Sequence, residues 1–146
     1  MVLTPHIVIG ALIAKLLPDN FWLIPLVILS HYLLDIIPHW DYINSISAFK
    51  NSVLKTALKV ILDLLVGLTL VYVFLGISWW ILLGIFMAIL PDLPLVMVAF
   101  WNNRFLKAYL KFNHIVHHWR SPLYLGILSQ MVIIIIFALI SLRLKM

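Results

Sequence analysis

Long apolar segments dominate this chain and set the narrowest limit on what it can fold into. Of its 146 residues, 65% are hydrophobic and 10% are charged, whereas a soluble domain is about half apolar and about a quarter charged. Backbone amides inside a bilayer must be paired within the protein, so such segments favour helices. The sequence therefore predicts an all-α polytopic membrane helical bundle that forms a single integral membrane domain over residues 1–146.

Five apolar segments are separated by turns and polar loops. They cover residues 2–17, 21–37, 53–75, 79–100 and 122–142. The first two would be on the order of 25 Å long as helices, so they are either thin spans or a re-entrant hairpin. We expect four to five short transmembrane or re-entrant helices, the fourth of which is broken by Pro91 and Pro94.

A further segment, residues 104–119, is amphipathic. Phe105 and Tyr109 recur at helical spacing on one face, and Lys107 and Lys111 lie on another. This pattern predicts an interfacial helix at the membrane surface, where basic side chains meet lipid head groups. We attribute the net charge of +5 to membrane contact and expect no nucleic-acid partner.

The distribution of basic residues predicts a topology. If all five segments cross the membrane, the N-terminus and the polar loops at 38–52 and 101–121 share one face. Those loops and the adjoining helix ends hold most of the Lys and Arg, so the positive-inside rule places them in the cytoplasm. We predict an integral protein of a prokaryotic inner (cytoplasmic) membrane, with its polar site facing the cytoplasm. The oligomeric state stays open.

Histidine and aspartate are the conspicuous polar residues of this apolar chain. It has six histidines, and all five of its acids are aspartates. Ionisable side chains are costly in a bilayer and there mark functional sites by default. Histidine nitrogens and aspartate oxygens together bind zinc, manganese or iron, and the absence of cysteine excludes a thiolate site. We predict a divalent metal cofactor, with zinc as the first choice and manganese or iron as alternatives.

The strongest motif is His-x-x-x-Asp-x-x-Pro-His-x-Asp, which begins at His31. His31 and Asp35 share a helix face and can bind one cation or two neighbouring ones. Pro38 ends the helix and lets His39 and Asp41 fold back over its end. The alternative is a polar helix end at the interface, in which Asp35 accepts a hydrogen bond from His31.

Three isolated residues complete the predicted set of site residues within the spans. His6 is expected at the same depth as the motif, and Asp92 lies in a broken span, where irregular backbone is tolerated if it lines a cavity. Asp63 either pairs with Lys59 or serves as a ligand or as an acceptor that orients a ligand histidine. The predicted metal ligands are His6, His31, Asp35, His39 and Asp92.

The late histidines form a second cluster before the last segment. Two of the three could bind metal, complete the coordination shell or act as a general acid, and the alternative is a basic surface helix facing lipid phosphates. The predicted catalytic residues are Asp41, Asp63, His114, His117 and His118. The predicted contacts to a substrate phosphate are Lys107, Lys111 and Arg120.

Residues 4–6 (Thr-Pro-His) and 30–41 resemble the YdjM-like group of small bacterial inner-membrane proteins. That group shares an early His, a Pro-Asp turn and a Ser-His-x-Leu-x-Asp helix end, which here is Ser30 to Asp35. The pattern is also distantly similar to zinc-dependent phospholipase C, where His-x-x-x-Asp pairs bind a zinc cluster. The similarity covers mainly the first 41 residues, and the chain lacks the His-Arg-Gly-x-Thr-His-type segment of the group. The resemblance implies a predicted metal-dependent hydrolase.

These observations lead to one functional hypothesis and two alternatives. The leading hypothesis is a membrane-embedded metal-dependent hydrolase of a phosphoester, such as a phospholipid or another lipid-linked phosphate, with metal-activated water as nucleophile. Its partners would be membrane lipid and the lipid or phosphoester substrate. One alternative is a non-enzymatic membrane subunit or ion-translocating protein that uses Asp63 and Asp92. The other is a histidine-box di-iron oxidase, for which this chain has few histidines.

Overall fold

The described part of the chain is helical. The computed structural model describes residues 2–40, 53–101, 103–116 and 122–145. The helices are α1 (Leu3–Leu16), α2 (Leu23–Ile36), α4 (Val53–Leu75), α5 (Trp79–Ile89), the short 3-10 helix η1 (Leu90–Asp92), α6 (Leu93–Phe100), α7 (Arg104–Val116) and α8 (Leu123–Arg143). The predicted all-α class is confirmed for these residues.

Three helical segments are long and apolar enough to cross a membrane. They are Val53–Leu75, Trp79–Val98 and Leu123–Arg143. In the apolar 18-residue stretch that qualifies each of them, only 17%, 22% and 28%, respectively, is buried inside the protein. So much outward-facing apolar surface is unusual for a soluble monomer and suits contact with lipid. α1 and α2 have 14 residues each, or about 21 Å of helix, which is shorter than a hydrocarbon core of about 30 Å.

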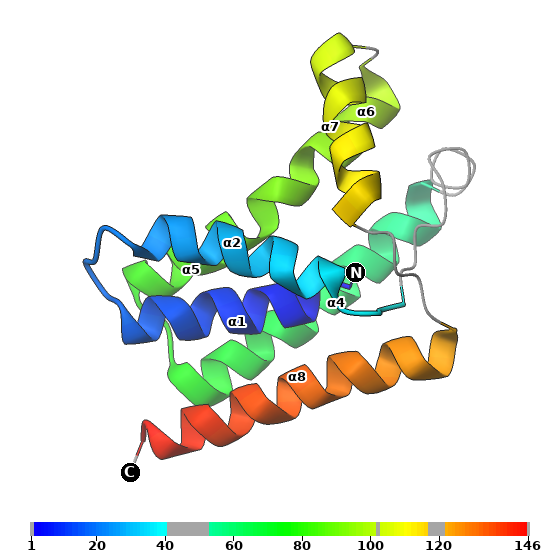
Figure 1. Cartoon of the computed structure of the whole chain (residues 1–146). Coiled ribbons are helices and arrows are strands. Elements are labelled where there is room, and N and C mark those ends of the chain that lie inside the picture. The colour runs from blue at the N-terminus through cyan, green and yellow to red at the C-terminus, as the bar shows by residue number, and fades with distance from the viewer. Residues whose placement is uncertain (1, 41–52, 102, 117–121, 146) are drawn as a thin grey trace.

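The ends of the helices fall into two sets at opposite ends of the bundle (Figure 1). The start of α1, the end of α2 and the starts of α4 and α8 lie at one end. The ends of α1, α4 and α8 and the starts of α2 and α5 lie at the other. His6 near the start of α1 and Asp35 near the end of α2 therefore lie toward the same end of the bundle as the start of α4.

α1 is the central helix of the bundle. It packs most extensively against α5 and α4, with further contacts to α2 and α8. Ile7, Val8 and Ala11 are completely buried, and the aromatic ring of Phe137 from α8 closes the same core cluster. This short helix is thus enclosed by other helices over most of its length, and its polar residues Thr4 and His6 are buried inside the protein, whereas Lys15 in its last turn is exposed.

α1 and α5 cross at two glycines. A Cβ atom added to Gly10 would lie 2.6 Å from the Cβ of Ala88 and 2.8 Å from the carbonyl oxygen of Gly84. Helix backbones approach this closely only where small residues meet. The crossing brings the end of α5, and with it η1, against α1.

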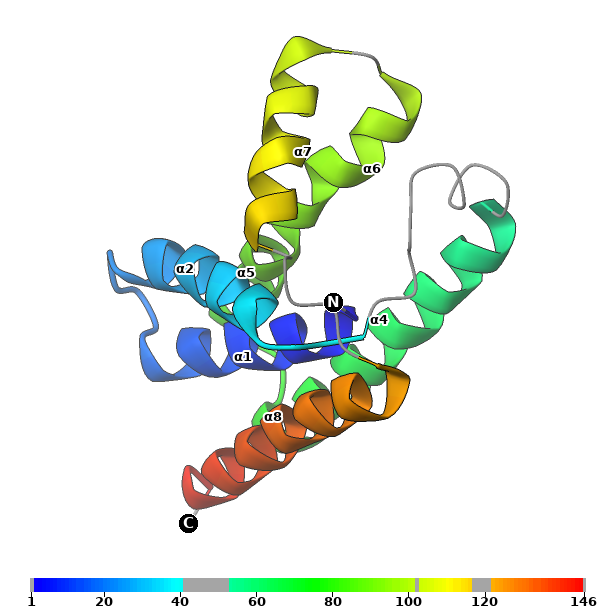
Figure 2. The ribbon, with the colours of Figure 1, turned by 45° about the vertical axis from the view of Figure 1, so that its right-hand side comes forward.

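The helix that begins as α5 breaks at Pro91, as expected. Pro91 cannot donate a backbone hydrogen bond, and residues 90–92 adopt a 3-10 turn. After it, α6 leaves the bundle and pairs with α7 (Figure 2). Arg104, Lys107 and Lys111 are exposed on α7, so the predicted amphipathic helix is present, although its expected last residues, 117–119, lie outside the described ones.

The crossing predicts that Gly84→Ala destabilises the protein. The added methyl would lie 2.5 Å from the carbonyl oxygen of Gly10 and 2.6 Å from the Cβ of Ala14. Overpacking costs about 1–3 kcal/mol, which outweighs a gain of up to about 1 kcal/mol in helix propensity. Thermal unfolding in mild detergent should show a lower midpoint for Gly84→Ala and an unchanged one for Ala108→Leu, an enlargement at an exposed position of α7. A more stable Gly84→Ala variant would contradict the close crossing.

Candidate metal centre

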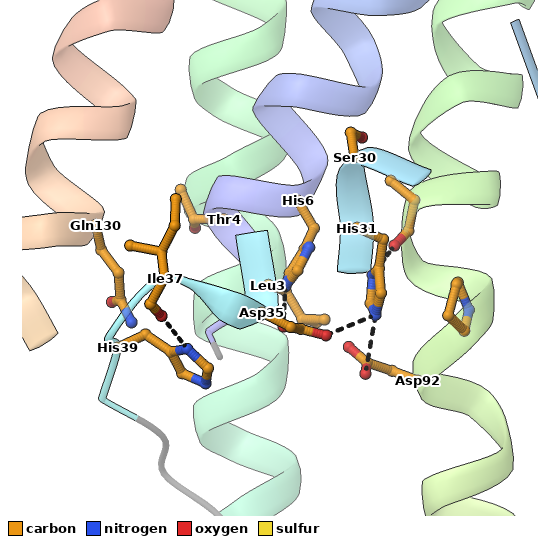
Figure 3. A network of polar contacts seen from close by, with 12 residues as sticks. Leu3, Thr4, His6, Ser30, His31, Asp35, Ile37, His39, Asp92 and Gln130 are labelled. Atoms are coloured by element: carbon orange, nitrogen blue, oxygen red, sulfur yellow. Dashed lines mark hydrogen bonds and ion pairs between the residues drawn. The ribbon is translucent and has the colours of Figure 1, made fainter. Parts of the chain in front are cut away.

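Three predicted ligands come together inside the bundle. His6 from α1 meets His31 and Asp35, which lie one turn apart on α2 (Figure 3). Their side chains are 1%, 0% and 1% exposed, and one candidate ligand atom from each lies within 4.8 Å of the others. His6 and His31 are far apart in the sequence and meet here because α1 and α2 form a hairpin.

The distance from each histidine to Asp35 is close to the distance between two ligands of one small cation. Nε2 of His6 lies 3.3 Å from one oxygen of Asp35, and Nε2 of His31 lies 3.1 Å from the other. Ligand atoms at about 2.0–2.1 Å from a tetrahedral zinc are about 3.3 Å from one another. The two imidazole rings are stacked, with centroids 4.2 Å apart, so both present their nitrogens toward the same carboxylate.

Missing hydrogen bonds at the histidine nitrogens also point to a bound ligand. Both Nε2 atoms lie against carboxylate oxygens of Asp35 without a hydrogen bond of good geometry, and Nδ1 of His6 has none among the described residues; all three nitrogens are buried. A buried polar atom without a hydrogen bond costs about 1–3 kcal/mol, and such atoms call for an explanation such as an ion or a water. A cation between these side chains would satisfy the two Nε2 atoms at once.

A backbone carbonyl orients His31. Nδ1 of His31 lies 2.8 Å from the carbonyl oxygen of Ala88. In a continuous α-helix that carbonyl would accept from the amide of Asp92, but a 3-10 turn bonds the amide to the carbonyl three residues back instead. The break at Pro91 therefore frees the acceptor. With Nδ1–H donating to it, Nε2 faces the carboxylates, and in the neutral ring this nitrogen carries the lone pair that a metal ion would take.

Asp92 lies at the accessible edge of the group. Its Oδ1 is 3.6 Å from Nε2 of His31, and its side chain is 25% exposed. It follows directly on Pro91 in η1, so the helix break that frees the carbonyl of Ala88 also presents this carboxylate. The structure thus places four of the five predicted ligands within one cluster, three buried and one partly exposed.

Two tyrosines beside the cluster were not singled out from the sequence as site residues. The hydroxyl of Tyr109 on α7 donates to the carbonyl oxygen of Pro91, and the hydroxyl of Tyr32 lies 3.3 Å away from it. Burial raises the pKa of Tyr109 above its ordinary value, so the hydroxyl stays protonated. The helical periodicity placed Tyr109 on the apolar face of α7, but no motif linked it to a proline in another helix.

Asp63 has a role that the sequence did not suggest. Its carboxylate accepts hydrogen bonds from the backbone amides of Leu3 and Thr4 and, at 2.6 Å, from the hydroxyl of Thr4. It therefore caps the N-terminus of α1, where helical amides lack partners and a negative charge is favourable. Between these described residues no ion pair forms with Lys59, whose side chain is exposed. Asp63 holds the helix that carries His6 and lies outside the metal group.

His39 is buried but stands apart from the group of three. Its Nδ1 lies 2.8 Å from the carbonyl oxygen of Ile37, on the segment that follows α2 (Figure 3). This segment crosses to α8, where Ser129 donates to the carbonyl of Pro38 and Gln130 to that of Trp40. Gly126 faces the backbone of Trp40 there, and a Cβ would collide with it. The segment fixes the end of α2 just after Asp35.

The remaining predicted site residues are not brought to this cluster by the described structure. His114, Lys107 and Lys111 are exposed on α7. The other four lie outside the described residues: Asp41, His117, His118 and Arg120.

Comparison with known proteins adds no relative. No family model, curated protein or solved structure matches the chain. The fold and the cluster by themselves define the class: an all-α protein with three helices able to cross a membrane and a buried His-His-Asp group that could hold a metal ion.

The capping role predicts the effect of Asp63→Asn. This variant keeps the shape of the side chain but removes its charge from the N-terminus of α1. We expect a loss of about 1–2 kcal/mol in unfolding free energy, with the bundle still folded and with faster hydrogen exchange at the amides of Leu3 and Thr4. Asp19→Asn, in an exposed turn where Asp19 has a φ of 57° that asparagine tolerates, is the control. Equal stability and exchange in the two variants would contradict the capping role.

Proposed function

We propose that this chain is a membrane-embedded metal-dependent hydrolase that cleaves a phosphoester of a lipid or of a lipid-linked phosphate. The observation that carries this proposal is the buried group of His6, His31 and Asp35, which offers two neutral nitrogen donors and a carboxylate at ligand spacing. Zinc is the proposed ion, because this donor set and the separations of about 3.3 Å suit its tetrahedral geometry. Manganese and iron are the alternatives.

The proposed chemistry is hydrolysis. An ion bound in this group supplies Lewis acidity and lowers the pKa of water, which makes hydroxide available near neutral pH. Asp35 lies between the two imidazole rings and neutralises part of the ionic charge. Asp92 is the member of the cluster that is open to the outside. We assign it either the fourth ligand position or the acceptance of a proton from the attacking water.

The substrate assignment rests on α7. Its basic side chains, Lys107 and Lys111, are exposed, while Tyr109 on the same helix contacts the turn that carries Asp92. A phosphate bound by these lysines would be held at the level of the membrane surface, on the helix that also contacts the turn with Asp92. Arg120 is a further proposed phosphate contact. His114, His117 or His118 is the proposed general acid, and His39 and Asp41 are proposed to complete the ligand shell or orient it.

Two observations bear on the alternative functions. The carboxylate of Asp63 is engaged by the N-terminus of α1, which leaves it unsuited to carry a proton or cation along a pathway and disfavours ion translocation through this residue. A histidine-box di-iron oxidase is disfavoured, because the described cluster brings together only two histidines. The hydrolase is preferred because Asp92 and the basic face of α7 add features that suit a phosphoester. The resemblance of residues 4–6 and 30–41 to the YdjM-like group favours the same assignment.

Metal content and hydrolysis test the proposal directly. Purified protein in mild detergent should bind Zn²⁺ stoichiometrically and hydrolyse bis(4-nitrophenyl) phosphate or a short-chain phospholipid. His31→Ala removes a donor and Asp35→Asn replaces a charged carboxylate with a neutral amide, so Zn²⁺ affinity should fall by more than the about 10–100-fold that follows loss of a group that only supports a ligand. Hydrolysis should be lost in parallel.

His114→Ala serves as the matched control for metal binding, because His114 is exposed on α7. It should retain the full Zn²⁺ content. Folded His31→Ala and Asp35→Asn variants with wild-type Zn²⁺ content would refute the metal centre. A wild-type protein that binds Zn²⁺ but hydrolyses neither probe would refute the hydrolase activity and would still support the metal centre.

We also propose that the cluster faces the cytoplasm of a prokaryotic inner membrane. Ile77 and Asn103 flank the apolar segment Trp79–Val98 and are exposed, and the chain has no cysteine of its own. In Asn103→Cys, an impermeant thiol reagent should react only after the cytoplasmic face is opened. In Ile77→Cys it should react from outside intact cells. The reverse labelling pattern would place the cluster on the extracytoplasmic side.

A further inference from the structure

We infer that Tyr109 is a positioning residue for Asp92, so that the surface helix α7 holds the accessible edge of the metal group in place. This inference rests on the proposed function where it concerns metal affinity. The contacts that carry it are independent of any ion.

The turn that presents Asp92 is weakly held by its own backbone. Pro91 and Pro94 have no amide hydrogen, so two hydrogen bonds of a continuous helix are missing around Asp92. The 3-10 turn that replaces them has poorer hydrogen-bond geometry. Its position must therefore be set partly by contacts from outside the turn.

Tyr109 supplies such a contact. Its hydroxyl donates to the carbonyl oxygen of Pro91, the residue immediately before Asp92. The same hydroxyl lies 3.3 Å from that of Tyr32, the residue immediately after His31. One oxygen atom thus links the neighbours of two members of the cluster, Asp92 and His31, whose side-chain atoms are 3.6 Å apart.

Aromatic packing keeps Tyr109 at this position. The ring of Phe112 lies edge-on to that of Tyr32, with centroids 5.5 Å apart, and 6.3 Å from the ring of Tyr109. Among the described helices, α7 packs mainly on α6 and has a smaller contact with α2. The three rings and the bond to Pro91 belong to the attachment of α7 to the site.

The experiment removes the hydroxyl oxygen of Tyr109. Tyr109→Phe keeps the ring and its packing but deletes the donor to Pro91. We expect Zn²⁺ affinity to fall about fivefold, in line with the loss of one hydrogen bond to a neutral group. Tyr124→Phe is the control, because Tyr124 on α8 is 71% exposed, and it should leave Zn²⁺ affinity unchanged.

A double-variant comparison separates positioning from general destabilisation. If Tyr109 acts through Asp92, Tyr109→Phe should have no further effect on Zn²⁺ affinity in the Asp92→Asn background. An equal fivefold loss in both backgrounds would overturn the inference, as would unchanged affinity of Tyr109→Phe.

A readout without metal keeps the test valid if the proposed function fails. The thiol introduced by Asp92→Cys is the only one in the protein, and its alkylation rate reports how firmly the turn is held. Adding Tyr109→Phe should raise this rate severalfold, and adding Tyr124→Phe should not. A wild-type protein that binds no Zn²⁺ would refute the metal centre, whereas an alkylation rate insensitive to Tyr109→Phe would refute the positioning role.

Discussion

The close crossing of α1 and α5 is the contact on which the metal group depends. Gly10 and Gly84 let the two backbones meet, and this places the carbonyl of Ala88 and the turn with Asp92 against the hairpin of α1 and α2. His31 is oriented by that carbonyl, and His6 enters the same space from α1. Packing of small residues, which by itself has no chemistry, thus determines where the polar side chains converge.

Asp35 and Asp63 each lie against groups that offset the cost of placing a carboxylate inside this apolar protein. Asp35, which is 1% exposed, lies against two histidines, and Asp63 lies against the positive end of α1. An unpaired carboxylate in such surroundings would be expensive. Asp35 shares its charge with histidines that can bind a metal ion, whereas Asp63 neutralises the positive end of a helix.

The sequence predicted those features that follow from local spacing. The pairing of His31 with Asp35 is a property of one helix turn, and the break at Pro91 follows from a missing amide, so both were predictable. The capping of α1 by Asp63, the acceptor role of Ala88 and the contact of Tyr109 with Pro91 join residues 18 to 60 positions apart. They depend on which helices become neighbours, and no periodicity in a single segment contains that information.

The central position of α1 has a consequence for the biogenesis of the protein. α1 is synthesised before α4 and α5, yet the carboxylate that caps it belongs to α4, and the glycine that it packs on belongs to α5. Until these later segments arrive, the hairpin of α1 and α2 lacks both its cap and most of its cover, and His6 has lipid or another protein as its neighbour. Assembly of the cluster must therefore wait until the chain up to residue 92 has been synthesised and α5 has packed on α1.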